Sequence, residues 1–266
     1  MATEGERFGP GLERWRNEMK VLGRNLLASC SIRRVVHCLE LLVNLELYFS
    51  PGSCPRVSII ALEDTGAPFE THLIAFMAGE HRKPGFLARN PSGKVPVLMV
   101  DGQPIVQTVA ILGFLDDAFP DAALFPKLES PLARAQFLAD LVSCSADLHP
   151  IVTRIAFPQI MIDHAEGAAA LRSKALEMMA FQLARFEARL QHQPWLAGQQ
   201  WSVLDAYLHW VWFRITGAGF DSTPFPGIAD HYARTLQRPS VQRALAREAE
   251  AVRDLESRGL MPRPKT

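Results

Sequence analysis

A serine and a cysteine stand side by side in the stretch SPGSCPRVS, residues 50–58, directly before a proline. Proline is favoured at the first position of a helix, so Pro55 is expected to place Cys54 at the N-cap. The sulfur would then lie against unpaired backbone N–H groups at the positive end of the helix dipole, which favours a nucleophilic thiolate. The alternative is that Cys54 is a small buried apolar side chain.

The sequence around this stretch indicates an α/β unit. LELYF, residues 45–49, predicts a strand, and the helix that Pro55 opens is expected to end at Gly66. A second strand is predicted over residues 68–74. The order strand, helix, strand is typical of a parallel pair of strands.

A hairpin and another helix are expected next. Asp101-Gly102 is a strong two-residue turn signal between PVLMV and QPIVQ. Thr108 is expected to cap the helix that follows, which Pro120 ends. This first part of the chain therefore contains all the predicted strands.

The second part has helical patterns only. Ser130-Pro131 is expected to begin a helix, and residues 166–191 are amphipathic. Ser202 and Asp205 have the spacing of a capping box, which assigns them to folding rather than to chemistry. We therefore expect an α/β domain over residues 45–122, a linker over 123–129 and an all-helical domain over 130–266.

Residues 1–44 do not continue either pattern. The apolar run from Val21 to Val43 is interrupted by arginines, so it predicts neither a transmembrane helix nor a clear signal peptide. We interpret residues 1–44 as an N-terminal extension, disordered or misannotated.

Composition excludes several classes of partner. Lys+Arg and Asp+Glu are both 28, so the formal net charge is zero and no nucleic-acid partner is expected. The cysteines and histidines have neither zinc-site spacing nor the pattern of a disulfide framework. The sequence thus predicts no metal, no membrane contact and a cytoplasmic location.

Three motifs carry a resemblance to a known family. NPSGKVPVL (90–98), QT (107–108) and WSVLDAYL (201–208) occur in the order found in cytosolic glutathione S-transferases, which the chain resembles over residues 45–258. The resemblance implies an α/β thioredoxin-like N-terminal domain followed by an all-α C-terminal domain. It also implies a homodimer with glutathione as co-substrate.

The resemblance assigns the binding of glutathione to two segments. Val95, before a cis Pro96, is expected to pair through its main chain with the cysteinyl unit of glutathione. Gln107 and Thr108 are expected to bind the γ-glutamyl carboxylate at the N-terminus of a helix. From spacing alone, Thr108 as a simple cap and Gln107 as a solvated side chain are equally good interpretations.

Two adjacent residues compete for the glutathione sulfur. YFSPGSC resembles the bacterial beta class, in which the cysteine contacts that sulfur, and this favours Cys54. The pattern SC-x-x-V also resembles classes in which a serine hydroxyl stabilises the thiolate, which makes Ser53 the alternative.

A histidine in the helical part completes the expected site. SADLHP, residues 145–150, resembles a beta-class segment whose histidine reaches across the cleft between domains to the cysteine, which corresponds to His149. An imidazole there would tune the thiol or donate a proton near neutral pH. Pro150 departs from the lysine often found after this histidine.

The function expected from the resemblance is a detoxifying glutathione transferase that acts on a hydrophobic electrophile, with a thiol-disulfide or peroxidase side activity through Cys54. The alternatives are a non-catalytic protein that binds ligands or partners, and a specialised lyase, dehalogenase or isomerase. Trp212 and Phe213 are expected in the core, with lining of an apolar substrate pocket as the alternative.

Overall fold

A four-stranded sheet opens the part of the chain that the structure, a computed structural model, describes, namely residues 43–260. The strands are β1 (Leu45–Phe49), β2 (Glu70–Leu73), β3 (Val97–Val100) and β4 (Gln103–Val106), in the order β2-β1-β3-β4. β1 and β2 are parallel neighbours connected by the helix α3 (Pro55–Thr65), and the other two strand pairs are antiparallel. The predicted parallel unit is thus confirmed. The extension expected over residues 1–44 lies outside the described residues except for its last two.

The turn between β3 and β4 is the predicted two-residue hairpin. Asp101 and Gly102 have φ angles of 48° and 78°, so both are in the left-handed region that the tightest hairpin turns require. Register follows from this turn, because Val100 pairs with Gln103 directly across it.

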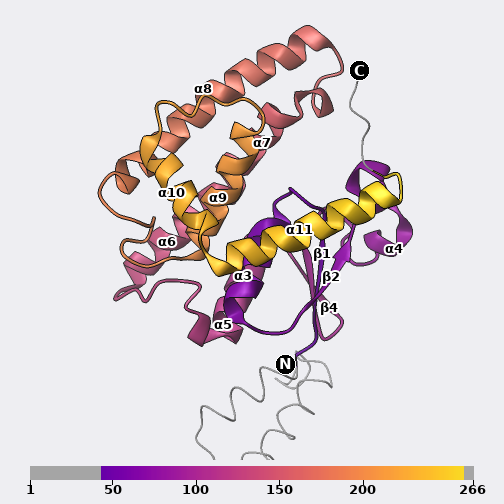
Figure 1. The fold of residues 1–266 in the computed structure, drawn as a ribbon, viewed down its shortest axis with the longest axis horizontal. Coiled ribbons are helices and arrows are strands. Elements are labelled where there is room, and N and C mark those ends of the chain that lie inside the picture. The colour runs from indigo at the N-terminus through magenta and orange to yellow at the C-terminus, as the bar shows by residue number, and fades with distance from the viewer. Residues whose placement is uncertain (1–42, 261–266) are drawn as a thin grey trace, which may run out of the picture. The chain divides into compact units, whose positions relative to one another are not determined.

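Helices account for the rest of the fold (Figure 1). Two of them, α4 (Pro84–Leu87) and α5 (Thr108–Ala118), belong to the sheet part. The helical part consists of α6 (Pro131–Ser143), α7 (His149–Ala156), α8 (Ala165–Leu190), α9 (Val203–Thr216), α10 (Pro226–Leu236) and α11 (Pro239–Ser257). This is the predicted thioredoxin-like domain followed by an all-α domain. α10 was not predicted from the sequence.

α3 is the helix that joins the two parts. It packs against β1 and α5 on the sheet side and against α9 and α11 on the helical side, where α11 lies across it in Figure 1. Its buried Arg56 pairs with Glu248 of α11, with 2.5 Å between Nη2 and Oε2, and its Glu63 pairs with Arg247 at 2.6 Å. α3 is therefore tied to α11 near both of its ends. The domain boundaries expected at residues 122 and 130 stay predictions.

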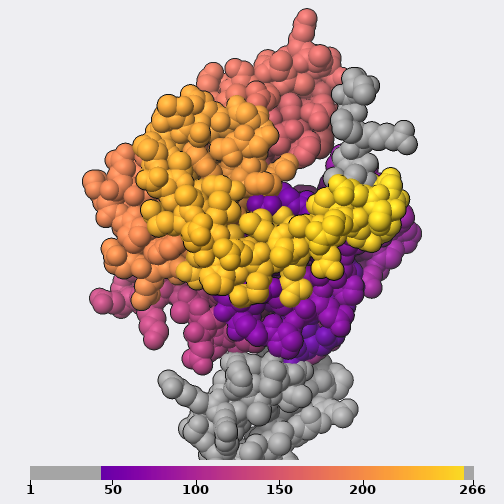
Figure 2. Space-filling model, viewed as in Figure 1, coloured from indigo at the N-terminus to yellow at the C-terminus, as the bar shows by residue number. Residues whose placement is uncertain are grey.

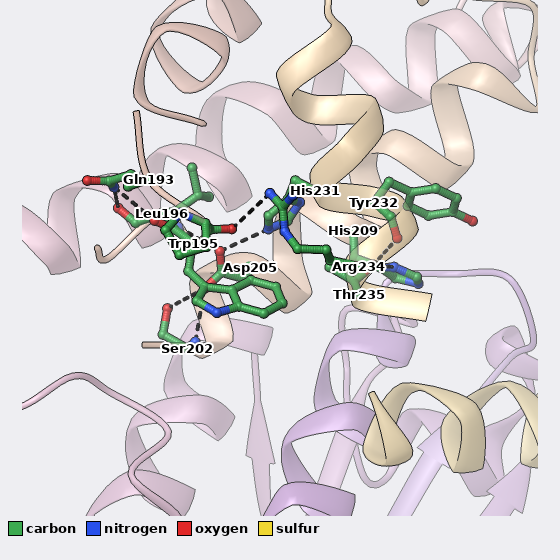
Figure 3. Close-up of polar contacts among 11 residues, drawn as sticks. Gln193, Trp195, Leu196, Ser202, Asp205, His209, His231, Tyr232, Arg234 and Thr235 are labelled. Carbon is green, nitrogen blue, oxygen red and sulfur yellow. Dashed lines mark hydrogen bonds and ion pairs between the residues drawn. The ribbon is translucent and has the colours of Figure 1, made fainter. Parts of the chain in front are cut away.

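A buried polar network fixes the start of α9 (Figure 3). The expected capping box is present, since Asp205 accepts hydrogen bonds from the backbone N–H and the hydroxyl of Ser202 at 2.9 and 3.0 Å. Asp205 also accepts from the N–H of Leu196 at 2.7 Å and lies 2.9 Å from Nε2 of His231. Ser202, Asp205 and His231 are 0% exposed.

Serine, histidine and aspartate are also the members of a hydrolase triad, but this network does not have that arrangement. In a triad the histidine contacts the serine, whereas here Ser202 and His231 each contact Asp205. With no access to solvent, the three residues organise the core of the helical part, which agrees with the folding role expected for the capping box.

Neither a membrane segment nor a metal centre is found within residues 43–260. No helix in that range combines the length and the apolar character that crossing a bilayer requires. The same range holds no group of three or more histidine, cysteine, aspartate or glutamate side chains placed to bind a metal ion.

Candidate functional site

The stretch between β1 and α3 forms a tight turn that ends at Cys54. Gly52 has a φ angle of 70°, and the backbone N–H of Ser53 donates to the carbonyl of Ser50. Cys54 is the N-cap of α3, as predicted, and Pro55 is the first helical residue. The Cys54 thiol is 7% exposed and donates to the carbonyl of Val95, with 3.5 Å between Sγ and O.

The thiolate expected at this N-cap is not what the surroundings favour. Burial raises the pKa of the Cys54 thiol to about 12, although a backbone hydrogen bond, the Thr108 side chain and the charge of Lys94 each lower it. The expectation from the helix dipole is wrong because the cost of burying a charged sulfur outweighs the dipole. Cys54 is therefore a hydrogen-bond donor at neutral pH.

Ser53 is engaged within the turn itself. Its hydroxyl donates to the carbonyl of Ser50, with 2.5 Å between the oxygens. Binding a glutathione sulfur through this hydroxyl would require that bond to break or to be shared. The thiol of Cys54 is also bonded to a carbonyl, but S–H is a weak donor and its contact is longer, so it is the easier of the two to redirect, which favours Cys54 over Ser53.

The loop before β3 brings the main chain of Val95 to Cys54. The side chain of Asn90 donates to the carbonyl of Lys94 at 2.7 Å, which closes the loop. Gly93 has a φ angle of 61°, and a Cβ there would lie 3.2 Å from the carbonyl oxygen of His81, so glycine fits best. The Val95–Pro96 peptide is cis, as expected. No hydrogen bond among residues 43–260 uses the N–H of Val95.

The start of α5 differs by one residue from the expectation. Gln107 is the N-cap and Thr108 is the first helical residue, so Thr108 is not the cap. Gln107 has φ 73° and ψ 123°, a conformation that costs a non-glycine residue about 1–3 kcal/mol and that is concentrated at ligand sites. Thr108 is 5% exposed, and its side chain lowers the pKa of the Cys54 thiol and of the Tyr207 hydroxyl, against the raising effect of burial.

His149 follows a widened turn between α6 and α7. Residues 144–148 form a π-helical turn, in which the N–H of His149 donates to the carbonyl of Cys144 five residues earlier. A proline in a regular α-helix would clash with the carbonyl four residues before it, and the wider turn accommodates Pro150. Nδ1 of His149 lies 3.3 Å from the hydroxyl of Tyr207.

Tyr207 lies between His149 and the residues around Cys54, and its place in the site was not predicted from the sequence. It is 0% exposed, and burial together with nearby Cys54 raises its pKa well above the usual value. Among the described contacts, His149 meets Tyr207 and the edge of Trp210 rather than Cys54 directly. A tyrosine inside the apolar run VLDAYL is a signal that could have identified it, because a buried hydroxyl needs a partner.

The surface is hollowed beside these elements. Figure 2 shows a hollow bordered by α11 and by the salmon and orange segments of the helical part, with indigo residues of the sheet part at its base. The sheet part is thus reachable from solvent on this face.

Comparison with known proteins agrees with this geometry. The family model of the glutathione S-transferase N-terminal domain matches residues 44–117, and that of the C-terminal domain matches residues 147–239. A glutathione S-transferase from Xanthomonas campestris pv. campestris is 30% identical over 212 residues, which are 77% of this chain and 98% of that protein. The chain belongs to the glutathione S-transferase family.

Two further similarities bear on the class of this transferase. A bacterial beta class glutathione S-transferase from Sphingomonas chungbukensis has a solved structure that is 30% identical, with a TM-score of 0.66 over 76% of this chain and 98% of that one. This confirms the expected likeness to the beta class. A maleylacetoacetate isomerase from Rhizobium meliloti is 32% identical over 145 residues, 54% of this chain and 67% of that protein.

His149 of this transferase is a neutral imidazole at pH 7. Burial, followed by the charge of Lys94, lowers its pKa to about 4. The expectation that His149 donates a proton near neutral pH is therefore wrong for this environment, because almost no imidazolium exists there. The neutral ring can still orient the hydroxyl of Tyr207.

We expect His149→Gln to make the stability of this transferase less sensitive to acid. The unfolded histidine has a pKa of about 6.5, so between about pH 6.5 and pH 4 only the unfolded chain binds the proton. Stability therefore falls as the pH falls through this window. The loss of unfolding free energy between about pH 8 and pH 5 should be about 1–2 kcal/mol smaller in the variant, measured by chemical denaturation.

A second buried histidine does not disturb this comparison. Burial lowers the pKa of His209 to about 3, so it adds acid sensitivity to the wild type and the variant alike and cancels in their difference. Equal losses in the two proteins would contradict the lowered pKa of His149.

Proposed function

We propose that this transferase conjugates glutathione to an electrophilic small molecule and that Cys54 holds the glutathione sulfur. The observation that carries the proposal is the meeting of three groups, since the Cys54 thiol lies 3.5 Å from the carbonyl of Val95 and the nearby Thr108 side chain lowers the pKa of the same thiol. The N–H of Val95, which has no hydrogen bond among residues 43–260, suits the cysteinyl main chain. The N-terminus of α5, with the strained Gln107, suits the γ-glutamyl carboxylate.

The chemistry follows from the state of Cys54. As a thiol, it donates its S–H hydrogen to the glutathione sulfur and stabilises that sulfur as the thiolate. The glutathione thiolate then attacks the electrophile, so that a carbon–sulfur bond forms, the leaving group departs with its electron pair and the glutathione proton passes to solvent. In this scheme Cys54 keeps its proton throughout.

The thiol-disulfide and peroxidase side activities depend on a different state of Cys54. Attack on a disulfide requires the thiolate of Cys54, and burial disfavours that form. We propose that these activities are slow. The isomerase alternative is supported by the similarity to a maleylacetoacetate isomerase, because an isomerase of this kind would use the same glutathione site. A homodimer, a cytoplasmic location and a role in detoxification are further parts of the proposal.

The test combines binding with turnover. Titration calorimetry with glutathione, and conjugation of 1-chloro-2,4-dinitrobenzene followed by absorbance, should both give a positive result. Binding without turnover of this general electrophile would favour a specialised isomerase or lyase. No binding at millimolar glutathione would contradict the proposal and favour a non-catalytic protein.

We expect Thr108→Val to raise the KM for glutathione about tenfold or more. The hydroxyl is proposed to donate to a carboxylate, and a hydrogen bond to a charged group contributes about 1.5–3 kcal/mol. The control is Thr71→Val on the edge strand β2, whose hydroxyl has no hydrogen bond among the described residues. Equal KM values in the wild type and Thr108→Val would remove Thr108 from the glutathione site.

A further inference from the structure

The helix α9 presents an arginine to the turn that precedes Cys54. The indole N–H of Trp210 donates to the carbonyl of Gly52, with 3.4 Å between the atoms, so α9 rests on the turn. A Cβ placed on Gly52 would lie 3.8 Å from Nη1 of Arg214 and 4.0 Å from Cε1 of Phe213. Gly52 is two residues before Cys54, a span of at most about 7 Å. A cationic group thus lies against the turn that ends at the proposed reaction centre.

The guanidinium of Arg214 has no carboxylate partner and no hydrogen-bond acceptor among residues 43–260. It is half-buried, with its Cζ 5.3 Å from the centre of the Phe157 ring. Its five N–H groups suit a planar carboxylate in a fork-to-fork arrangement. A guanidinium that is partly exposed and has no partner in this range is available to an anion from outside the chain.

The neighbouring charges leave a net positive charge at this place. Arg56 and Glu248 form an ion pair and cancel each other, and Arg56 also lies against the ring of Phe213 at 3.7 Å. Burial and the charge of Arg56 lower the pKa of Arg214, while Glu248 raises it. Among Arg56, Glu248 and Arg214, the charge of Arg214 is therefore the one that no opposite charge balances.

The aromatic residues around Arg214 define an apolar wall. Phe157 and Phe213 are partly exposed; Phe157 lies against the guanidinium, and Phe213 approaches Gly52, the same turn residue as Arg214 does. Trp212, the other residue considered for the substrate pocket, is 4% exposed and packs against Phe220 and Phe225 in the core. Of the two candidates, Phe213 is therefore the one placed beside the turn.

We infer that Arg214 binds a carboxylate of the electrophile, so that the enzyme prefers electrophiles with an apolar or aromatic body and an anionic group. The inference rests on the proposed glutathione transferase function and names the substrate class of that same site. The carboxylate would sit on Arg214, and the body of the electrophile against Phe157 and Phe213, next to the sulfur that Cys54 holds. It refines the expectation of a purely hydrophobic electrophile.

The test uses two electrophiles that share the ring and the leaving group and differ in the charge of one substituent. 4-Chloro-3,5-dinitrobenzoate and its neutral carboxamide react with glutathione at the same carbon and release chloride. In Arg214→Gln we expect the ratio of kcat/KM for the benzoate to kcat/KM for the carboxamide to fall at least tenfold. Arg214→Lys should keep most of the preference. Arg253→Gln, on the exposed face of α11, is the matched control for net charge and should leave the ratio unchanged.

A binding measurement separates this inference from the proposed function. The glutathione conjugates of both electrophiles are titrated into the wild type and Arg214→Gln, which needs no turnover. Tighter binding of the carboxylate conjugate by the wild type, lost in Arg214→Gln, supports the inference even if the enzyme conjugates neither electrophile. Equal affinity of the wild type for both conjugates overturns it. A rise in the KM for glutathione with both electrophiles, at a constant ratio, also overturns it, because Arg214 then serves glutathione itself.

Discussion

Asp205→Ala should lower the free energy of unfolding by about 3–5 kcal/mol, a large part of the total stability of a domain. Asp205 accepts hydrogen bonds from Ser202 and Leu196 and lies 2.9 Å from the His231 ring, all at full burial. Removing the carboxylate leaves these donors unsatisfied inside the core. The loss therefore exceeds the 1 kcal/mol or so that an ordinary helix cap contributes.

Chemical denaturation at neutral pH measures this loss. The matched control is Asp254→Ala on α11, whose carboxylate pairs with Arg258 at 2.9 Å on the exposed surface and should matter by less than about 1 kcal/mol. If Asp205→Ala proves too unstable to purify, Asp205→Asn keeps one acceptor oxygen and should show an intermediate loss. Similar stabilities for Asp205→Ala and Asp254→Ala would show that the network in Figure 3 does not stabilise the fold.

The sequence predicted those parts of the fold that depend on local signals. Alternation in residues 45–49, the Asp101-Gly102 turn and the spacing of Ser202 and Asp205 each specify their own element, and all three are confirmed. The helix α10 was not predicted, although Pro226 stands at its first turn. Its apolar pattern is too short to indicate a helix by itself, and packing against α8 and α9 stabilises it.

The sequence indicated which residues to consider for the candidate site, but less of their chemistry. The thiolate expected at Cys54 follows from the dipole of α3, which is local, whereas the burial that opposes it comes from tertiary packing, in which the loop before β3 places the carbonyl of Val95 against the sulfur. The same holds for His149, whose pKa is set by how α7 and α9 pack. Tyr207 contacts His149, and Arg214 approaches Gly52, only through the placement of α9, which no local pattern specifies.

Cys54→Ala should reduce kcat/KM for conjugation by about ten- to a hundredfold. The variant loses an S–H donor to the glutathione sulfur, and a hydrogen bond to a charged group contributes about 1.5–3 kcal/mol. Cys54→Ser supplies a hydroxyl donor at the same place and should retain part of the activity. Ser53→Ala is the matched control, because its hydroxyl is already bonded to the carbonyl of Ser50, and its effect should be much smaller.

Intact mass after treatment with glutathione disulfide tests the state of the same sulfur. With a pKa of about 12, Cys54 is almost wholly protonated at pH 8, so the wild type should gain little more glutathione than Cys54→Ala. Rapid addition of one glutathione to the wild type, absent in Cys54→Ala, would show a reactive thiolate. It would support the thiol-disulfide activity expected through Cys54. A loss of conjugation in Ser53→Ala alone would instead show hydroxyl-based chemistry, because the Ser53 side chain would then have left Ser50 to hold the glutathione sulfur.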